Sequence, residues 1–232
     1  MDLSRRSTQP ETMDDADLDP ATYARCLRDL ATVNRVTMTH GPTLRWLRRA
    51  CRAMPAGGTV TILDVACGHG DLLRAIGRRA ARAGIGVRLI GIDLNPASAA
   101  VAQAATPSDM AIEWRTGDVF AYVPSPAPDF VVSSQFAHHL TDPQVEEFLR
   151  WLDRTAGRGW FVADLQRHVL AYWGFQLLAR LVGWHRIVRE DGAISVARSF
   201  RLADWRARLA AAGIVARVRW VMPFRICVER LK

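Results

Sequence analysis

Apolar residues follow two different spacings in the middle of this chain. Short runs rich in β-branched residues predict buried strands, at residues 59–65, 87–92, 111–114, 130–133 and 160–163. Between these runs apolar residues recur every three or four positions, which predicts amphipathic helices, at residues 72–80, 95–105 and 142–152. Strands that alternate with helices through short turns are typical of a parallel sheet with helices on both faces. The pattern therefore predicts an α/β fold.

The flanking segments depart from this alternation. Three more helices are expected, at residues 20–36, 43–53 and 202–212, and residues 166–200 form a helical insertion without a strand. The last two apolar runs, residues 215–221 and 225–229, are separated only by a short turn at Pro223. A turn this short predicts an antiparallel hairpin.

Composition and charge narrow the class of protein. Half of the 232 residues are hydrophobic and 23% are charged, which is enough to bury a core. The net charge is +8, and residues 1–20, with six acids and two arginines, carry −4, so the remainder carries +12. The arginines are spread over many helices instead of clustering with aromatic residues, so we expect a solvated surface and no nucleic-acid partner.

Cysteine spacing and the N-terminus bear on location. The four cysteines form neither a CxxC pair nor a zinc spacing, so we expect reduced thiols, no metal site and a cytoplasmic, reducing compartment. The first 20 residues lack the apolar run of a signal peptide. The most apolar stretch, residues 169–184, contains Gln176 and Arg180 and is too short to span a bilayer.

Acids and glycines occur where the predicted strands end. The first strand ends at Asp64 and leads into Gly68-His69-Gly70, while Asp93 and Asp118 end the next two strands. Open α/β sheets bind ligands at this edge. Leu73 stands where a dinucleotide fingerprint requires its third glycine, which argues against NAD or FAD.

Four segments carry a family resemblance, in the order ILDVACGHGDLL, LIGIDLNP, RTGDVF and FVVSSQFAHHL. Together they resemble the class I S-adenosylmethionine-dependent methyltransferases, over about residues 59–165, and the C-terminal hairpin fits that family's sheet. The resemblance implies a Rossmann-like sheet of seven strands, S-adenosylmethionine as cofactor, and an acceptor of the quinol, sugar or polyketide type.

The resemblance also suggests a domain organisation. We expect an acidic disordered tail at 1–20, an N-terminal helical cap at 21–58 and a cofactor-binding core at 59–165, followed by a helical substrate lid at 166–200 and a C-terminal helix and hairpin at 201–232. It implies cofactor contacts for residues at the strand ends, namely Asp64, Ala66, Gly68, Gly70, Asp93, Leu94, Asp118, Val119 and Ser134. Asp93 would hold the ribose hydroxyls, and Arg35 is expected to pair with the cofactor carboxylate.

A candidate catalytic group follows the fourth strand. His138 and His139 lie on the loop that would face the transferred methyl group, and Asp164 ends the neighbouring fifth strand. A carboxylate beside a histidine fixes its tautomer and raises its basicity, which suits removal of a proton from a hydroxyl acceptor. The sequence does not decide which histidine is the base.

The helical insertion predicts an aromatic lid over an apolar acceptor, with Tyr172, Trp173, Phe175, Trp184 and His185 as candidate substrate contacts. O-methylation of a hydroxylated small molecule by a monomer or homodimer is the main expectation. Three alternatives stay open: C-methylation of a quinol-like ring, a nucleic-acid methyltransferase, and a non-catalytic cofactor-binding protein. The Asn/Asp-Pro-Pro-aromatic motif that accompanies methylation of base amino groups is absent.

Overall fold

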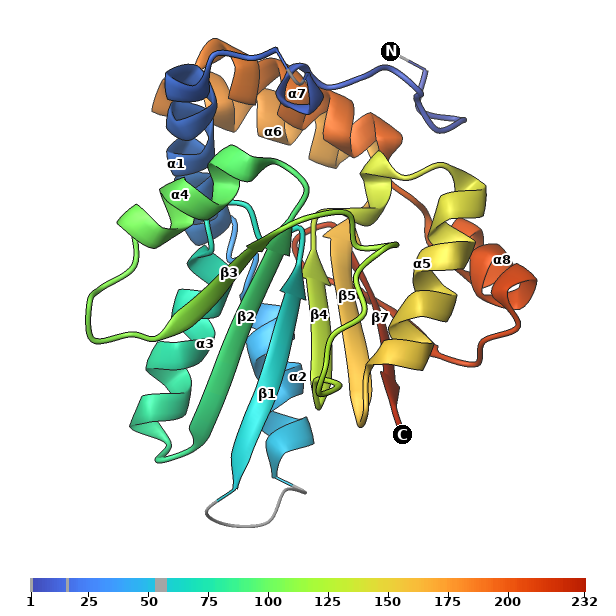
Figure 1. The fold of residues 1–232 in the computed structure, drawn as a ribbon. Coiled ribbons are helices and arrows are strands. Elements are labelled where there is room, and N and C mark those ends of the chain that lie inside the picture. The colour runs from blue at the N-terminus through green and yellow to red at the C-terminus, as the bar shows by residue number, and fades with distance from the viewer. Residues whose placement is uncertain (1, 16, 53–57) are drawn as a thin grey trace.

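A seven-stranded sheet forms the centre of the computed structural model, which describes residues 2–15, 17–52 and 58–232 (Figure 1). The strand order is β3-β2-β1-β4-β5-β7-β6. The strands span Thr59–Val65 (β1), Gly86–Asp93 (β2), Ile112–Thr116 (β3), Phe130–Ser134 (β4), Gly159–Leu165 (β5), Arg217–Val221 (β6) and Arg225–Leu231 (β7). The first five are parallel and β7 runs antiparallel to both of its neighbours, which confirms the predicted α/β class and hairpin.

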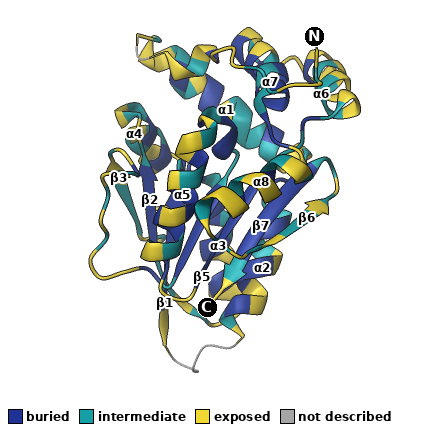
Figure 2. Cartoon of the chain, turned by 90° about the vertical axis from the view of Figure 1, so that its right-hand side faces the viewer, coloured by how far each residue is buried: buried dark blue, intermediate teal, exposed yellow. Residues whose placement is uncertain are grey.

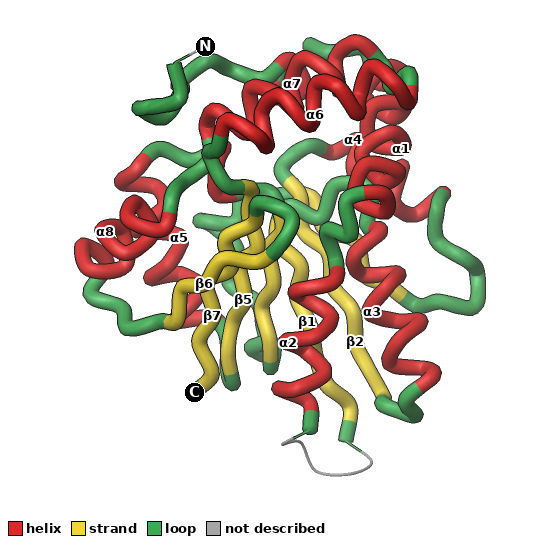
Figure 3. The backbone as a smooth tube through the Cα atoms, turned by 180° about the vertical axis from the view of Figure 1, so that it is seen from behind, coloured by secondary structure: helices red, strands yellow, loops and turns green. Residues whose placement is uncertain are grey.

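Helices cover both faces of the sheet (Figures 1 and 3). One face carries α2 (Gly41–Cys51) and α3 (Asp71–Arg82), and the other carries α5 (Asp142–Thr155) and α8 (Leu202–Ala212). Successive strand residues point to opposite faces, so Ile62 packs in the core with Trp46 of α2 while Leu63 packs in the core with Phe148 of α5. The predicted end of the second helix at Ala53 lies outside the described residues.

Strand register brings the strand ends to one edge. Val65 is paired with Ile92 on one side and with Ser133 on the other, and Leu165 is paired with Arg225. The residues that follow β1, β2, β4 and β5, together with the first residue of β7, therefore open on the same edge of the sheet.

Three helices form a layer above this edge (Figures 1 and 2). They are α1 (Pro20–Val36), α6 (Val169–Val182) and α7 (Arg186–Arg198), and α1 also packs against α4 (Pro96–Ala104). Their buried side chains form a core separate from the two sheet cores, made of Cys26, Val33, Ala179, Trp184, Ile187 and Val188. Within the described part of the chain, none of the helices is both long and apolar enough to cross a membrane.

The N-terminal segment lies against this helical layer. The Arg6 guanidinium stands 3.7 Å from the Phe200 ring centroid and donates to the Leu140 carbonyl at 2.9 Å. The backbone N–H groups of Thr12 and Met13 both donate to the Asp191 carboxylate at 2.9 Å. This arrangement differs from the disordered tail expected from composition, because the charges of the segment find partners on α7 and on the loop after β4.

Candidate active site

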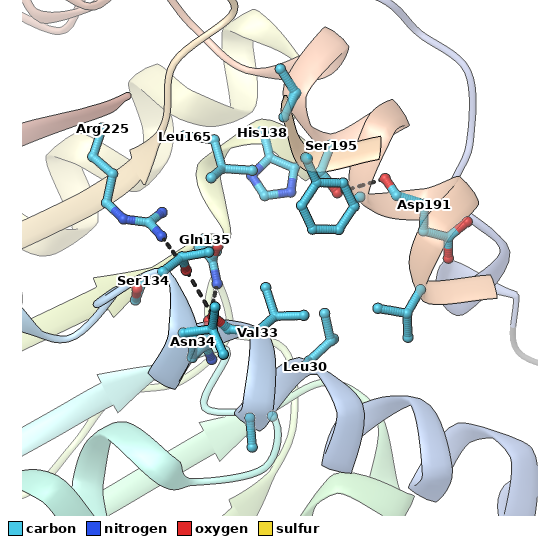
Figure 4. Close-up of a pocket in the computed structure, with 18 of the residues that line it drawn as sticks. Leu30, Val33, Asn34, Ser134, Gln135, His138, Leu165, Asp191, Ser195 and Arg225 are labelled. Atoms are coloured by element: carbon cyan, nitrogen blue, oxygen red, sulfur yellow. Dashed lines mark hydrogen bonds between the residues drawn. The ribbon is translucent and has the colours of Figure 1, made fainter. Parts of the chain in front are cut away.

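A cavity of about 460 Å³ opens at the strand-end edge, beneath the layer of helices (Figure 4). Its walls come from the loop after β1, the end of β4 with the loop that follows it, helices α1, α6 and α7, and the turn that starts β7. Apolar side chains such as Leu30, Val33 and Leu165 supply much of the wall. The cavity therefore joins the predicted cofactor loop to the predicted lid.

The loop after β1 presents backbone and a buried carboxylate to the cavity. Ala66 and Gly68 have φ angles of 56° and 48°, in the left-handed region, and both line the cavity. The Asp64 carboxylate lies in the same wall, and no hydrogen bond to it is found among the described residues. Burial, then the charges of Asp71 and Asp93, raise its pKa well above the usual value. A ligand ammonium group at this point would balance the carboxylate, which fits the methionine end of S-adenosylmethionine.

A polar network beside this loop joins Asn34 and His40 of the N-terminal helical segment to Asp71 and Gln135. Asp71 accepts hydrogen bonds from His40 Nε2 at 2.7 Å and from Asn34 Nδ2 at 3.1 Å, and Gln135 Nε2 donates to the Asn34 amide oxygen at 2.7 Å. Burial raises the pKa of Asp71, but the two hydrogen bonds outweigh it and hold the pKa below its usual value. Arg35, predicted in this region, is exposed and does not line the cavity. Its neighbour Asn34 lines the cavity, because one turn of α1 presents only one side to it (Figure 4).

The predicted nucleoside contacts lie outside the cavity. The Asp93 carboxylate accepts hydrogen bonds from Gly68 N at 2.8 Å, Asn95 N at 3.0 Å and Ser98 Oγ at 3.0 Å, so it is satisfied within the fold. Three further candidates are an exposed Leu94, an Asp118 that accepts from Phe120 N in its own turn, and a Val119 buried in the core. Helix α1 packs on α4 beside this stretch, with Leu27 of α1 against Gly68.

Gly70 is required by packing. Its φ is 75°, and a Cβ there would lie 2.2 Å from the indole ring of Trp114. Gly70 therefore allows β3 to pack under the turn before α3, and it is not part of the cavity wall.

His138 and Asp164 form the predicted pair. His138 Nδ1 lies 2.7 Å from one oxygen of the Asp164 carboxylate, and the His138 backbone N–H donates to the other oxygen at 2.9 Å. Burial raises the pKa of Asp164, but the charge of His138 and its hydrogen bonds outweigh it and lower the pKa. With its Nδ1 facing the Asp164 carboxylate, the neutral form of His138 carries the proton on Nδ1 and the lone pair on Nε2, the nitrogen at the cavity.

Glu11 and His139 surround this nitrogen, and Glu11 was not predicted. Glu11 Oε1 lies 3.7 Å from His138 Nε2, and Glu11 Oε2 lies 4.0 Å from His139 Nε2. All three residues line the cavity, and Asp14 holds His139 Nδ1 at 3.0 Å. The side-chain atoms of Glu11, His138 and His139 that could bind a metal ion lie within 4.8 Å of one another. However, the Arg198 guanidinium, 3.8 Å from Glu11 Oε1, already supplies positive charge there. No sequence motif marks Glu11, since it reaches the site from the docked N-terminal segment.

The aromatic lid is only partly realised. Phe175 lines the cavity with Leu170, Ala171, Gly174 and Leu178, which share one face of α6 at helical spacing. The other four candidates lie off this face. Trp173 is 58% exposed and contacts Tyr172 edge to face, Trp184 is buried against Phe175, and His185 caps α7 by accepting from Ile187 N. Helical spacing turns Tyr172 and Trp173 away from the cavity, and Trp184 and His185 lie beyond the end of α6 at Val182.

The burial of Glu11 predicts a pH-dependent stability. Burial raises its pKa from 4.5 to about 7, so between these pH values the unfolded chain has lost the proton that the folded chain still holds. The folded state is therefore destabilised progressively as pH rises from about 4.5 to 7, by roughly 3 kcal/mol in total. We expect Glu11→Gln to raise the melting temperature relative to the unmodified protein more at pH 8 than at pH 5. The exposed Glu147→Gln is the control, and equal shifts for Glu11→Gln at both pH values would contradict the assignment.

Comparisons with known proteins agree with this architecture. Residues 62–159 match the model of a methyltransferase domain. A segment of 68 residues is 40% identical to the 2-phytyl-1,4-naphtoquinone methyltransferase of Thermosynechococcus vestitus (strain NIES-2133 / IAM M-273 / BP-1), and it spans 29% of this chain and 28% of that protein.

Solved structures are similar over nearly the whole chain. The plantazolicin methyltransferase BpumL, in complex with a triazolic desmethylPZN analog and S-adenosylhomocysteine, has a TM-score of 0.65 at 12% identity, over 95% of this chain and 98% of its own. A methyltransferase dependent on S-adenosylmethionine from Aquifex aeolicus has a TM-score of 0.62 at 19% identity, over 92% and 98%. Residues 62–159 therefore match a methyltransferase domain, and the chain as a whole has the fold of these S-adenosylmethionine-dependent methyltransferase structures.

Proposed function

We propose that this chain transfers a methyl group from S-adenosylmethionine to a hydroxyl group of a largely apolar small molecule, with His138 as the base. The observation that carries the proposal is the His138–Asp164 pair, whose Nε2 faces a mostly apolar cavity that the predicted cofactor loop also lines. The domain match and the structural relatives, several of which hold S-adenosylmethionine or S-adenosylhomocysteine, support the cofactor.

Different residues of the cavity would bind the cofactor and remove the proton of the acceptor. When bound, S-adenosylmethionine supplies a methyl group already activated on a sulfonium. Asp64, Ala66, Gly68 and Ser134 would hold its methionine end, and Asp93 would hold its ribose once its contact with Gly68 N is exchanged. His138 Nε2 would accept the hydroxyl proton while Asp164 holds the Nδ1 proton, so the acceptor oxygen gains the methyl group as it loses its hydrogen. The apolar wall would exclude water from the acceptor.

A quinol ring is the second candidate acceptor. It is favoured by the naphthoquinone methyltransferase relative, although the shared segment covers less than a third of either chain. A quinol offers both a hydroxyl oxygen and a ring carbon as the methylated atom. The proposal of O-methylation is tested by incubating the protein with methyl-labelled S-adenosylmethionine and a 1,4-naphthohydroquinone. NMR of the product then assigns the label to oxygen or carbon. A label on ring carbon would replace the first candidate with the second.

The proposed ribose contact predicts a cofactor-affinity loss. Asp93→Ala removes a pair of charge-assisted hydrogen bonds to the ribose, so S-adenosylmethionine should bind about 30- to 150-fold more weakly, or roughly 2–3 kcal/mol. Calorimetry measures this affinity, and the exposed Asp109→Ala is the matched control. The melting temperature of each variant is measured alongside, because Asp93 also bonds to Gly68, Asn95 and Ser98. Unchanged affinity in folded Asp93→Ala would remove Asp93 from the site.

A further inference from the structure

A buried arginine in the cavity wall has no anionic partner. Arg225, the first residue of β7, is 2% exposed and lines the cavity (Figure 4). Its Nη2 donates to the hydroxyl oxygens of Thr37 at 3.0 Å and Thr39 at 2.5 Å. Its Nε and Nη1 are buried without a hydrogen-bond partner, and no carboxylate of the described residues forms an ion pair with it.

The electrostatics leave this guanidinium unbalanced. A buried charge is costly unless a counter-charge and hydrogen bonds compensate it, and two neutral hydroxyls satisfy only one of the three nitrogens. Burial lowers the pKa of Arg225 to about 10, so the side chain is still cationic at neutral pH. The charge of Asp164 offsets part of this effect, but that carboxylate is already bonded to His138 and to Leu165 N. An anion from outside the chain would complete the pair.

Two strands separate the backbone of Arg225 from the cofactor loop. Its backbone is paired with Leu165 at the end of β5, and β4 and β5 stand between it and β1. At the spacing of neighbouring strands this places its Cα roughly 14 Å from β1 across the sheet. Phe224 from the hairpin turn and Leu170 from α6 line the cavity with it, while its guanidinium reaches Thr37 and Thr39 at the end of α1. The cofactor loop side holds the carboxylates of Asp64 and Asp71 instead.

We propose that Arg225, anchored by Thr37 and Thr39, binds a carboxylate of the methyl acceptor. The acceptor is then a hydroxylated, largely apolar acid whose hydroxyl faces His138 and whose carboxylate takes the free Nε and Nη1 donors. A planar guanidinium binds a carboxylate better than it binds a neutral amide, because it supplies positive charge together with donors in a fixed geometry. The inference rests on the proposed function and specifies the substrate class for the same cavity.

The test compares two probes that differ in one group. 3-Hydroxybenzoate and 3-hydroxybenzamide are titrated into the protein saturated with S-adenosylhomocysteine, and binding is measured by calorimetry. We expect the carboxylate to bind at least 10-fold more tightly than the amide. Arg225→Gln should abolish this preference, Arg225→Lys should keep part of it, and Arg217→Gln, an exposed arginine on the neighbouring strand, should leave it unchanged. The comparison in the unmodified protein needs no variant to fold.

Two results would overturn the inference. Equal binding of the two probes to the unmodified protein would show that the cavity does not select an anion. The second is an Arg225→Gln variant that binds S-adenosylmethionine more weakly but binds its decarboxylated analogue as tightly as the unmodified protein does, which would assign Arg225 to the cofactor's own carboxylate. Failure to bind S-adenosylhomocysteine at all would overturn the proposed function together with this inference, whereas binding it without a carboxylate preference would overturn only the inference.

Discussion

Replacing His138 with alanine is expected to lower methyl-transfer turnover by roughly 10²- to 10⁴-fold and to leave S-adenosylmethionine affinity nearly unchanged. The loss follows from removing a positioned general base. Of the two histidines, His138 is the expected base, because its Nδ1 lies 2.7 Å from the carboxylate of a fully buried Asp164, which orients Nε2 toward the cavity. Affinity should persist because His138 lies beyond the methionine end of the proposed cofactor position. Single-turnover kinetics and calorimetry measure the two effects separately.

His139 and Asp164 supply the controls for this result. His139→Ala should cost much less turnover, because the partner of His139 Nδ1 is the half-exposed Asp14 and not a buried carboxylate. Asp164→Asn should give a milder loss than His138→Ala, since it disturbs the tautomer without removing the ring. A double variant of both histidines that turns over at full rate would leave proximity as the mechanism and would remove both residues from the catalytic list.

Deleting residues 2–15 is expected to lower both stability and turnover. The deletion removes the Arg6 contacts to the Leu140 carbonyl, the Asp142 carboxylate and the Phe200 ring. It also removes the two N–H donors that satisfy buried Asp191. Charge-assisted hydrogen bonds of this kind contribute a few kcal/mol in total, so at pH 5, where buried Glu11 keeps its proton, we expect a loss of roughly 3 kcal/mol and a melting temperature about 6–12 °C lower. Turnover should fall as well, because Glu11 leaves the side of His138.

Substitutions at two adjacent arginines test whether the effect of the deletion comes from the contacts of Arg6. Arg6→Ala should reproduce part of the loss in melting temperature, while Arg5→Ala, on an exposed neighbour, should change it little. A deletion variant that melts within a degree or two of the full chain would mean that the segment does not dock in solution. The disordered tail expected from the acidic composition would then describe the segment correctly.

The fold could be predicted because its signals are local. Asp19, Asn95 and Thr141 each cap the helix that follows them, as expected from side chains that accept a backbone N–H. Gly213 takes the left-handed conformation that ends α8. The His138–Asp164 pair was also predictable, because neighbouring parallel strands bring their ends together at one edge.

The rest of the site could not be predicted because it depends on contacts between segments distant in sequence. Glu11 reaches His138 only through the docking of the N-terminal segment, and Arg225 reaches the cavity only because β7 runs antiparallel to β5. The prediction that Asp93 faces a ligand directly did not account for Gly68, Asn95 and Ser98, which already donate to it. Aromatic content alone likewise could not show which face of α6 points inward.

Calorimetric titration of the unmodified protein with S-adenosylhomocysteine, and in parallel with NADH, tests the central claim most directly. The account predicts that S-adenosylhomocysteine binds at one site per chain and that NADH does not compete for it, because Leu73 stands where the dinucleotide fingerprint needs glycine. Tight binding of NADH without binding of S-adenosylhomocysteine would contradict both the cofactor and the proposed methyl transfer.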